Sequence, residues 1–371
     1  MDVSNNPGRR TKIAVLGCGN VGVAISSDLS IRGYDVSLIK TSPAKSVIYD
    51  RMIANSNRVL LKEHGEYTES HIKDVSCDLD KLLDADIVFI ATQSTCHEQL
   101  IKKIGGYLNP SQIVICICSY MSSFYFRKYC ESIPVIVETT GPYLEGRLEE
   151  NDVEGEVVFR VGCRLSRSPL SIFQPEKSNW CMDRMRKLYS GFSNDYSVVE
   201  SALLNPNMIL HTVGSIMSIP RIEYSGGNFC MYREAYSRRN CSTMKIMYGL
   251  DGEKKKVLKR LGCNPVDVFV SAGFHGNAVE SFYRYSGSKD RAVSPTSVRS
   301  RYITEDVSQG LVLLESIAEK IGVPVPITSS LINISSVALS EDFRANGRTI
   351  QRLGAEEYIE GLASYNHAYA L

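Results

Sequence analysis

The sequence predicts an α/β protein in which a doubly wound parallel sheet is followed by an all-α C-terminal domain. Three observations predict this fold class: short β-rich runs alternate with helical segments in the first half, a glycine-rich turn follows the first run, and β-rich runs are absent after residue 197. We therefore expect a disordered polar tail over residues 1–10, an α/β domain over residues 11–195 and a helical domain over residues 196–371.

The first strand and the turn after it predict a nucleotide site. Lys12 to Leu16 is β-rich and leads into Gly17-Cys18-Gly19-Asn20-Val21-Gly22, and an amphipathic segment follows through Ile31. In such a turn the first glycine permits the bend, the second lets backbone approach a pyrophosphate, and the third lets helix and strand pack closely. The phosphates then lie at the helix N-terminus, where free N–H groups favour anions. We assign dinucleotide binding in a Rossmann-type domain to Gly17, Gly19, Asn20, Val21 and Gly22.

The end of the second strand indicates which nicotinamide cofactor is used. This strand, Asp35 to Ile39, is followed by Lys40, where an NAD-preferring site usually has an acidic residue for the ribose 2′-hydroxyl. Lys40 is followed by Thr41, Ser42 and Lys45. Hydroxyls and cations suit a 2′-phosphate, so we expect NADP(H) as the preferred cofactor and NAD(H) as the alternative. The competing interpretation is that these residues belong to a solvated loop and bind no phosphate.

Later runs extend the same sheet. Strands are expected at residues 86–91, 113–118 and 134–139, and a hairpin-like pair at residues 157–164. Thr92 follows the first of these strands at the carboxyl edge, where open α/β sheets bind ligands, so we assign it to the cofactor site. His97 begins the next helix, a position where a histidine is more often a cap or a surface residue.

The second half contains long helical periodicities and one conspicuous histidine. Helices are expected over residues 198–217, 229–261, 305–322 and 327–343. His211 lies among apolar residues of the first, and Asn207 precedes it by one turn. A lone histidine on such a helix is usually a hydrogen-bonded core residue. The functional interpretation is a general acid or base, because imidazole titrates near neutral pH.

Composition excludes several classes of protein. The sequence has 43% hydrophobic residues, 22% charged residues and a net charge of +1. A protein with so small a net charge has no overall electrostatic field that would attract nucleic acid or an anionic membrane. No run reaches membrane-spanning length, and the first ten residues lack the apolar core of a signal peptide. The eleven cysteines form no CxxC pair and no ligand spacing with histidine. We expect reduced thiols, no metal and a cytoplasmic location.

Ordered groups of residues, spread over nearly the whole chain, carry a family resemblance. In the helical half they are Asn205-Pro206-Asn207 with His211, Arg221 to Gly227, and Tyr232-Arg233-Glu234. Elsewhere they are Glu138-Thr139 with Tyr143 and Arg147, Arg301 to Val307 with Gly310-Leu311-Val312, and Gly347-Arg348-Thr349 with Leu353-Gly354. This set resembles the octopine/nopaline dehydrogenase family, the opine dehydrogenases. The resemblance implies a helical domain like the C-terminal domain of 6-phosphogluconate dehydrogenase.

The resemblance also implies a reaction. A 2-oxo acid and the amino group of an amino acid form an imine, which NAD(P)H reduces to a secondary amine (a CH–NH bond). The catalytic histidine of the family falls on His211 and its partner carboxylate on Asp306. Such a pair is chemically sensible, because Asp306 orients the ring and stabilises the imidazolium. Glu305 is the competing carboxylate, and Asp306 is otherwise a residue favoured by the dipole at a helix N-terminus.

Two carboxylate-bearing substrates need cationic anchors, for which guanidinium is well suited. The candidates are Arg147, Arg233 and Arg301, each of which is equally compatible with a surface salt bridge. Asn207 is expected to hold substrate or imidazole, and Tyr143 to line the cleft between the domains or to pack in it.

The chain departs from the family pattern at two points. Ser119 to Phe124 follows the strand at residues 113–118, where the family leads us to expect a glycine-rich turn. Bulkier side chains near the nicotinamide or the oxo acid put the substrate in doubt more than the reaction class. His211 is also followed by Thr212 instead of the expected proline.

Two other functions remain open from the sequence. One is a related two-domain reductase that converts a 2-oxo acid or similar carbonyl to an alcohol without an amine; the other is a catalytically silent nucleotide-binding protein. A required amine separates the first from the opine reaction, and retention of His211 and Asp306 argues against the second. The expected partners are small-molecule substrates and a second copy of the chain in a homodimer, with no nucleic acid or membrane.

Overall fold

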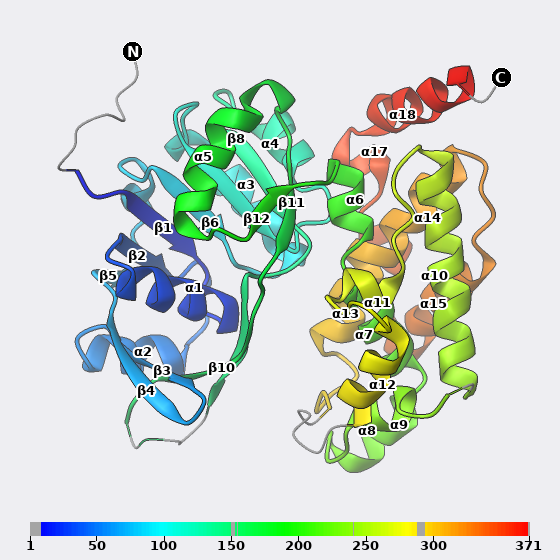
Figure 1. Cartoon of the computed structure of the whole chain (residues 1–371), viewed down its shortest axis with the longest axis horizontal. Helices are drawn as coiled ribbons and strands as arrows, with labels where there is room; N and C mark the ends of the chain where they lie inside the picture. Colours follow the sequence, from blue (N-terminus) through cyan, green and yellow to red (C-terminus); the bar gives the residue numbers. More distant parts are fainter. Residues whose placement is uncertain (1–8, 150–152, 154, 240, 288–293, 370–371) are drawn as a thin grey trace. The chain divides into compact units, whose positions relative to one another are not determined.

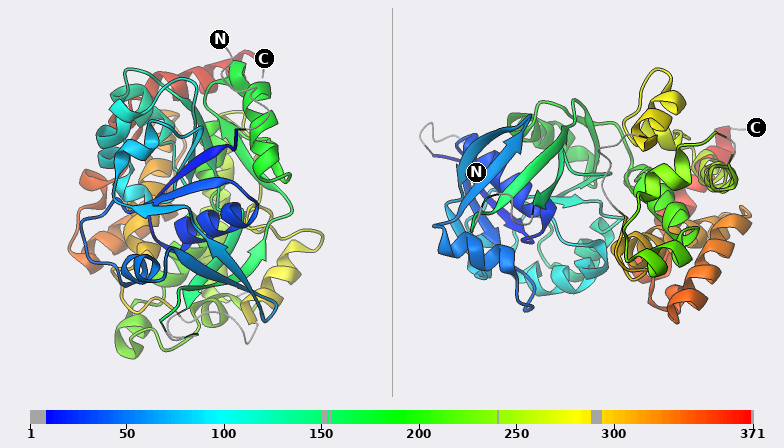
Figure 2. Two further views of the ribbon diagram at one scale, coloured as in Figure 1. Left: turned by 90° about the vertical axis from the view of Figure 1, so that its left-hand side faces the viewer. Right: turned by 90° about the horizontal axis from the view of Figure 1, so that it is seen from below.

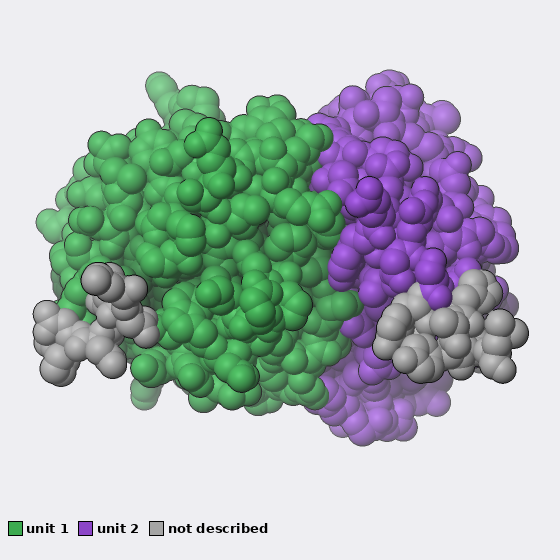
Figure 3. Space-filling model, turned by 90° about the horizontal axis from the view of Figure 1, so that it is seen from above, with its two compact units in different colours: residues 1–198 green, residues 199–371 purple. Residues whose placement is uncertain are grey.

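The computed structural model describes residues 9–149, 153, 155–239, 241–287 and 294–369. The chain forms two compact units, Met1–Val198 and Val199–Leu371 (Figure 3). Of the expected tail, residues 1–8 lie outside the described residues; Arg9 and Arg10 are exposed, and Arg9 Nη2 lies 3.1 Å from Asp86 Oδ1. None of the helices formed by the described residues combines the length and the hydropathy that crossing a bilayer requires.

The first unit is built on an eight-stranded sheet with the order β12-β11-β8-β7-β6-β1-β2-β5 (Figure 1). Its strands are β1 (Lys12–Leu16), β2 (Asp35–Ile39), β5 (Asp74–Ser76), β6 (Ile87–Ile90), β7 (Ile113–Ile117), β8 (Val135–Thr139), β11 (Ser168–Ile172) and β12 (Phe192–Asn194). All neighbours are parallel except β11 and β8. The chain winds from β1 to β2 on one side and later to β6 on the other, so β1 marks the switch point at which such sheets bind ligands.

Helices of the first unit are α1 (Asn20–Ile31), α2 (Val47–Ala54), α3 (His97–Ile104), α4 (Ser123–Tyr129) and α5 (Ser178–Leu188), with short 3₁₀ turns η1 (Leu79–Leu82), η2 (Ser94–Cys96), η3 (Gly105–Tyr107) and η4 (Pro175–Lys177). Every residue of β6 and β7 is buried, as expected for central parallel strands covered on both faces. Figure 2 shows these helices and strands from two further directions.

A second sheet of four strands, in the order β4-β3-β10-β9, belongs to the same unit. Its strands are β3 (Arg58–Glu63), β4 (Glu66–His71), β9 (Leu144–Glu149) and β10 (Val158–Arg164). The hairpin expected within residues 157–164 is therefore wrong, because β10 is one strand that pairs with β9 and β3. Arg164 ties this sheet to α1: its guanidinium contacts the buried Asp28 at 2.5 Å and Glu63 at 3.0 Å.

The second half contains helices and loops but no strand among its described residues, as predicted. The helices are α6 (Val198–Leu203), α7 (Asn207–Ile216), α8 (Ile219–Ser225), α9 (Met231–Tyr236), α10 (Ser242–Arg260), α11 (Val268–Ser271), α12 (Ala278–Gly287), α13 (Arg301–Glu305), the π-helix η5 (Asp306–Leu311), α14 (Val312–Lys320), α15 (Pro326–Leu339), α16 (Phe343–Asn346), α17 (Ile350–Leu353) and α18 (Glu356–Tyr369). The fold class is thus a Rossmann-like sheet followed by a helical domain.

Two of the predicted long helices are interrupted. The segment 198–217 divides into α6 and α7, because Pro206 lacks an N–H group and disfavours helix at the residue before it. The segment 229–261 divides into α9 and α10. These breaks shorten the helices but leave His211 well inside α7.

Candidate active site

The glycine turn has the geometry of a phosphate cradle. Gly17 has φ +114°, and a Cβ there would lie 3.1 Å from Ala91 and Thr92. A Cβ on Gly22 would lie 1.7 Å from the Gly17 carbonyl oxygen, so no larger residue fits. Gly19, the N-cap of α1, has nothing within 4 Å of a Cβ position. The turn is therefore closed behind Gly17 and Gly22 and open at Gly19, which leaves room for an anion at the start of α1.

The side chains around this turn fit a dinucleotide in different ways. Thr92 Oγ1 is buried and has no hydrogen-bond partner among the described residues. The Asn20 side chain is already occupied, because the Leu148 amide donates to its Oδ1 at 2.7 Å, and Val21 packs against the core. Asn20 and Val21 can thus contribute backbone N–H groups, whereas Thr92 offers a free hydroxyl. Burial raises the pKa of the Cys18 thiol to about 12, so the turn adds no negative charge.

The residues after β2 carry cations and hydroxyls without an acidic residue. Lys40 is half-buried, and its ammonium donates to the Ser42 carbonyl and lies 5.7 Å from the Tyr49 ring centroid. Thr41 is half-buried, whereas Ser42 and Lys45 are exposed. The structure thus holds Lys40 in place at the end of β2, and Lys45 extends into solvent.

Sequence reasoning missed a buried polar network at the carboxyl end of β7. His97 is fully buried, not the expected cap or surface residue: its Nδ1 lies 2.8 Å from Ser122 Oγ, and its Nε2 lies 3.2 Å from the Thr92 carbonyl. Glu138, also fully buried, accepts hydrogen bonds from Met121 N at 3.0 Å and Ser123 N at 2.7 Å. Its signal in the sequence was an acidic residue inside an apolar strand.

This network holds an unusual loop. Cys118, Tyr120 and Met121 all have positive φ, between 49° and 64°, although none is glycine. Such conformations are unfavourable for residues with a Cβ and persist where surrounding contacts impose them. The Glu138 carboxylate, which also accepts from the Ser119 hydroxyl, supplies such contacts. The chain therefore forms with ordinary residues the bend for which we expected glycine.

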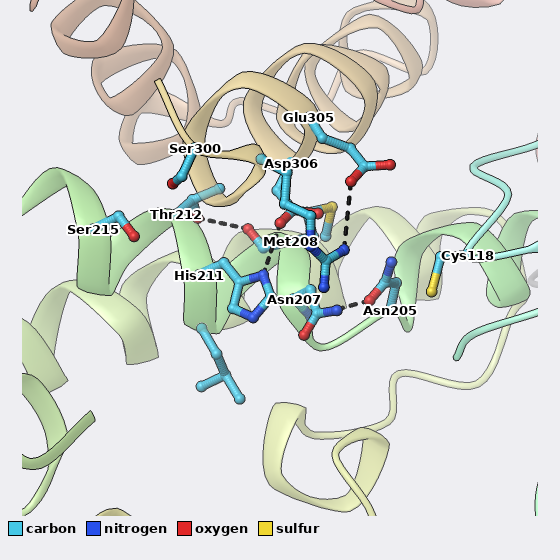
Figure 4. A network of polar contacts seen from close by, with 12 residues as sticks. Cys118, Asn205, Asn207, Met208, His211, Thr212, Ser215, Ser300, Glu305 and Asp306 are labelled. Carbon is cyan, nitrogen blue, oxygen red and sulfur yellow. Dashed lines mark hydrogen bonds and ion pairs between the residues drawn. The ribbon is translucent and has the colours of Figure 1, made fainter. Parts of the chain in front are cut away.

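In the helical unit, His211 and Asp306 meet. His211 lies on α7 and is 5% exposed; Asp306 begins the π-helix η5 and is 2% exposed. His211 Nδ1 lies 2.9 Å from Asp306 Oδ2, and Figure 4 shows the two side chains pointing toward each other from their helices. A charge-assisted hydrogen bond to Nδ1 fixes the orientation of the imidazole ring.

Two neighbours of Asp306 have distinct positions. Glu305 is buried and points away from His211 in Figure 4; its Oε2 lies 3.5 Å from Arg301 Nη1. Tyr302, which sequence reasoning did not assign, stacks on His211 with ring centroids 3.6 Å apart and an interplanar angle of 5°. Its signal was the spacing of four residues to Asp306, which places both on one helical face.

Close packing supports the π-helix. A Cβ on Gly347 would lie 2.4 Å from the Phe343 carbonyl oxygen and 2.7 Å from the Ser308 carbonyl oxygen. The amide of the buried Arg348 donates to the Ser308 carbonyl at 2.8 Å. The Gly347-Arg348 motif thus packs directly on the element that carries Asp306.

The expected substrate-binding residues fall into both units. Asn207 and Arg301 lie on α7 and α13 of the helical unit, and Arg233 is exposed on α9. Arg147 is exposed on β9 and Tyr143 precedes that strand, both in the first unit. Tyr143 stacks on Tyr189 at 4.1 Å between centroids, a contact typical of core packing.

Among the described residues no group of three or more His, Cys, Asp or Glu side chains could hold a metal ion. The chemistry available to these residues is proton transfer at His211 and anion binding at the glycine turn.

Two family models match the chain. Residues 195–339 match the model of the NAD/NADP octopine/nopaline dehydrogenase α-helical domain, and residues 13–118 match that of ketopantoate reductase PanE/ApbA. Opine dehydrogenase of Arthrobacter sp. (strain 1C) is 23% identical over 361 residues, which cover 92% of this chain and 94% of that protein. Vitopine synthase of Allorhizobium ampelinum is 24% identical over 372 residues, covering 94% of this chain and 97% of that protein.

Solved structures share the fold over nearly the full length. Octopine dehydrogenase in complex with NADH and L-arginine has a TM-score of 0.72 at 17% identity and covers 95% of this chain and 98% of its own. Yersinopine dehydrogenase with NADP⁺ bound has a TM-score of 0.69 at 13% identity and covers 96% of this chain and 97% of its own.

Proposed function

Because the chain belongs to the opine dehydrogenase family, we propose that it reduces the imine of a 2-oxo acid and an amino acid to a secondary amine with a nicotinamide cofactor. The family assignment makes the chain an opine dehydrogenase-like oxidoreductase. The proposal adds the reaction on CH–NH and the residues that perform it.

One observation carries the proposal: the hydrogen bond between His211 Nδ1 and Asp306 Oδ2 at 2.9 Å. Both groups are buried on elements of one unit, and a buried imidazole paired with a carboxylate is an arrangement for proton transfer. With Asp306 accepting a hydrogen bond from Nδ1–H, the imidazole would use the Nε2 lone pair as its base. This favours His211 as the acid–base residue over a merely structural histidine.

The condensation needs a base first and an acid later. His211 Nε2 takes a proton from the ammonium group of the amino acid, which frees the amine to attack the ketone carbon. The resulting imidazolium, stabilised by Asp306, returns the proton to the carbinolamine hydroxyl as water leaves and the protonated imine (iminium) forms. His211 thereby ends neutral, and the positive charge stays on the imine nitrogen, whose carbon accepts the hydride.

The hydride comes from the reduced nicotinamide cofactor, which the first unit would hold. Gly17, Gly19 and Gly22 would bind the pyrophosphate at the start of α1, with backbone N–H groups of Asn20 and Val21, and the hydroxyl of Thr92 would donate to it. Lys40, Thr41, Ser42 and Lys45 would bind a 2′-phosphate, so NADPH is proposed as the preferred cofactor and NADH as the alternative. Solved relatives hold NADH in one case and NADP⁺ in another.

Carboxylate anchors complete the proposal. Arg301 is the first candidate, since it lies five residues before Asp306 and is held at 3.5 Å by Glu305. Arg233 and Arg147 are further candidates, while Asn207 lies one turn from His211 on the same helix. Octopine dehydrogenase structures contain L-arginine, agmatine or pyruvate, which makes these molecules the first probes.

A second candidate function follows from the match of residues 13–118 to ketopantoate reductase. A reductase of that kind would reduce the carbonyl group of an oxo acid to an alcohol without an amine. His211 would then protonate the alkoxide, so the same pair serves both reactions.

Cofactor oxidation with each substrate alone and in combination tests the two candidates. We expect NADPH absorbance to fall only when an oxo acid such as pyruvate and an amino acid are both present. Oxidation with the oxo acid alone would favour the carbonyl reductase. Tight cofactor binding with no oxidation across a broad panel of oxo acids and amines would favour a silent nucleotide-binding protein.

A further inference from the structure

We propose that Tyr302 is a positioning residue of the His211–Asp306 pair: its ring holds the imidazole plane in place and stabilises the protonated imidazole through its π face. This inference rests on the proposed acid–base role of His211. It starts from the parallel stack, with centroids 3.6 Å apart and planes 5° apart.

The continuous helical segment formed by α13 and η5 contacts His211 in two ways. Tyr302 on α13 covers a face of the imidazole, and Asp306, four residues later, contacts its Nδ1 edge at 2.9 Å. The hydrogen bond alone allows the ring to tilt about the axis from Nδ1 to Oδ2. The stack opposes that tilt, so both contacts together fix the direction of Nε2.

Tyr302 is itself supported from behind. Its half-buried ring packs against the apolar cluster of Ile222, Phe229 and Met231. The aromatic ring therefore lies between a fixed apolar surface and the imidazole, and its position does not depend on a bound substrate.

Stacking also has an electrostatic effect. The face of an aromatic ring carries partial negative charge, so it attracts a cation that lies on it. Protonation of His211 during the reaction creates such a cation. Tyr302 and Asp306 thus favour the same charged form of His211, one through its π electrons and one through its carboxylate.

Several charged groups on the elements around α7 have their own partners. On α13, Arg301 pairs with Glu305, and its Cζ lies 5.9 Å from the Tyr302 ring centroid. The Tyr236 hydroxyl of α9 donates to the Leu210 carbonyl. Elsewhere, Arg221 of α8 pairs with Glu234 of α9, Lys254 and Lys255 of α10 pair with Asp251, and Glu253 of α10 accepts from backbone amides of Ile327 and Thr328. The residues of α15 include no titratable side chain.

The test is an NMR titration of His211 in the full chain, without cofactor or substrate. The chain has six histidines, and loss of one signal in H211N identifies the resonance. We expect Y302L, which keeps apolar bulk but lacks a π face, to lower the titration midpoint by about 0.5 to 1 pH unit. Y302F keeps the face and should keep the midpoint near that of the wild type. V298A, which trims the same apolar cluster, is the packing control.

A graded series of ring-fluorinated variants keeps the proposal testable if Y302L fails to fold. Phenylalanine analogues with one, two or three ring fluorines at position 302 keep the shape but progressively weaken the negative face. A midpoint that falls with each fluorine supports the proposal, and an unchanged midpoint overturns it. Equal shifts in Y302F and Y302L overturn it as well, because the hydroxyl would then be responsible. The titration needs no turnover, so its outcome is independent of whether the condensation reaction is found.

Discussion

His211 Nδ1 lies 2.9 Å from Asp306 Oδ2, although the two residues are 95 positions apart in the chain. The contact depends on α7 presenting the imidazole and η5 presenting the carboxylate, both buried in the helical unit. A charged pair in such surroundings is costly unless its members satisfy each other. Each of the two residues is therefore needed to satisfy the buried polar group of the other.

Replacing Asp306 should separate chemistry from binding. D306N leaves the imidazolium without a compensating charge, so we expect kcat to fall about 10²- to 10⁴-fold with cofactor affinity unchanged. Steady-state kinetics and a cofactor titration measure the two quantities. The matched control is E305Q, which should mainly raise KM through its contact with Arg301. Equal loss of kcat in both variants would move the partner role to Glu305.

The glycine turn predicts opposite outcomes for two alanine variants. G19A places its Cβ in open space, so its unfolding temperature should equal that of the wild type. Its affinity for the cofactor should fall at least about tenfold, because the methyl group would occupy the anion position. G22A places its Cβ 1.7 Å from the Gly17 carbonyl oxygen and should cost about 1–3 kcal/mol of stability. Thermal unfolding and fluorescence titration with NADPH distinguish them. Wild-type affinity in a folded G19A protein would exclude this turn as the phosphate site.

Lys40 should decide between the two cofactors. If Lys40 binds the 2′-phosphate as proposed, K40A removes a charge-assisted contact, so NADPH affinity should fall about 10- to 100-fold while NADH affinity stays unchanged. K73A, whose ammonium contacts Asp35 at 2.6 Å in the same unit, is the control and should change neither affinity. If K40A weakens both cofactors equally, Lys40 does not read the 2′-phosphate.

Glu138 should be important for stability although it lies on a strand of the core. In E138Q an amide group would face the Met121 or Ser123 N–H donor, so we expect a loss of about 1–3 kcal/mol in the free energy of unfolding. Denaturant unfolding measures the loss. D84N alters a carboxylate that is 79% exposed and pairs with Lys12, and it should change stability by less than about 0.5 kcal/mol. Indistinguishable values for the two variants would show that the loop does not need the carboxylate.

The helical unit should lose stability in acid through Glu315. Burial opposes ionisation there, but hydrogen bonds from Arg344 and Ser329 outweigh it and lower the pKa of Glu315 below its ordinary value. A lowered pKa in the folded state gives stability that is present above the unfolded-state pKa and lost as pH falls through the folded-state pKa. The stability difference between wild type and E315Q should therefore shrink as pH falls below the ordinary glutamate pKa of about 4.3 and through the lower pKa of the folded state. A difference independent of pH contradicts this role.

Local patterns predicted the fold class because they depend on neighbouring residues. The run from Lys12 to Gly22 contains a strand, a turn and a helix start within one short segment, and the structure has all three. The second sheet was not predicted, since β3 pairs with β10 about one hundred residues later and has a mixed apolar and charged sequence. The breaks at Pro206 and between α9 and α10 were hidden by continuous helical periodicity.

The candidate site shows the same division. The family motifs placed His211 and Asp306, but the face-to-face contact of Tyr302 depends on the relative rotation of α7 and α13, which no local pattern specifies. His97 was misjudged because its hydrogen-bond partners, the Ser122 hydroxyl and the Thr92 carbonyl, lie on other segments of the chain. Roles assigned to Arg147, Arg233 and Arg301 remain predictions.

The π-helix between α13 and α14 makes the site sensitive to the length of the chain. A π turn accommodates one residue more than an α turn, and each residue of an α-helix rotates the chain by about 100°. Deleting one residue within Asp306–Leu311 would convert the π turn into an α turn, so α13 and α14 would keep their phase while the residues inside the turn would shift. Because Asp306 begins this turn, such a deletion would act directly on its contact with His211.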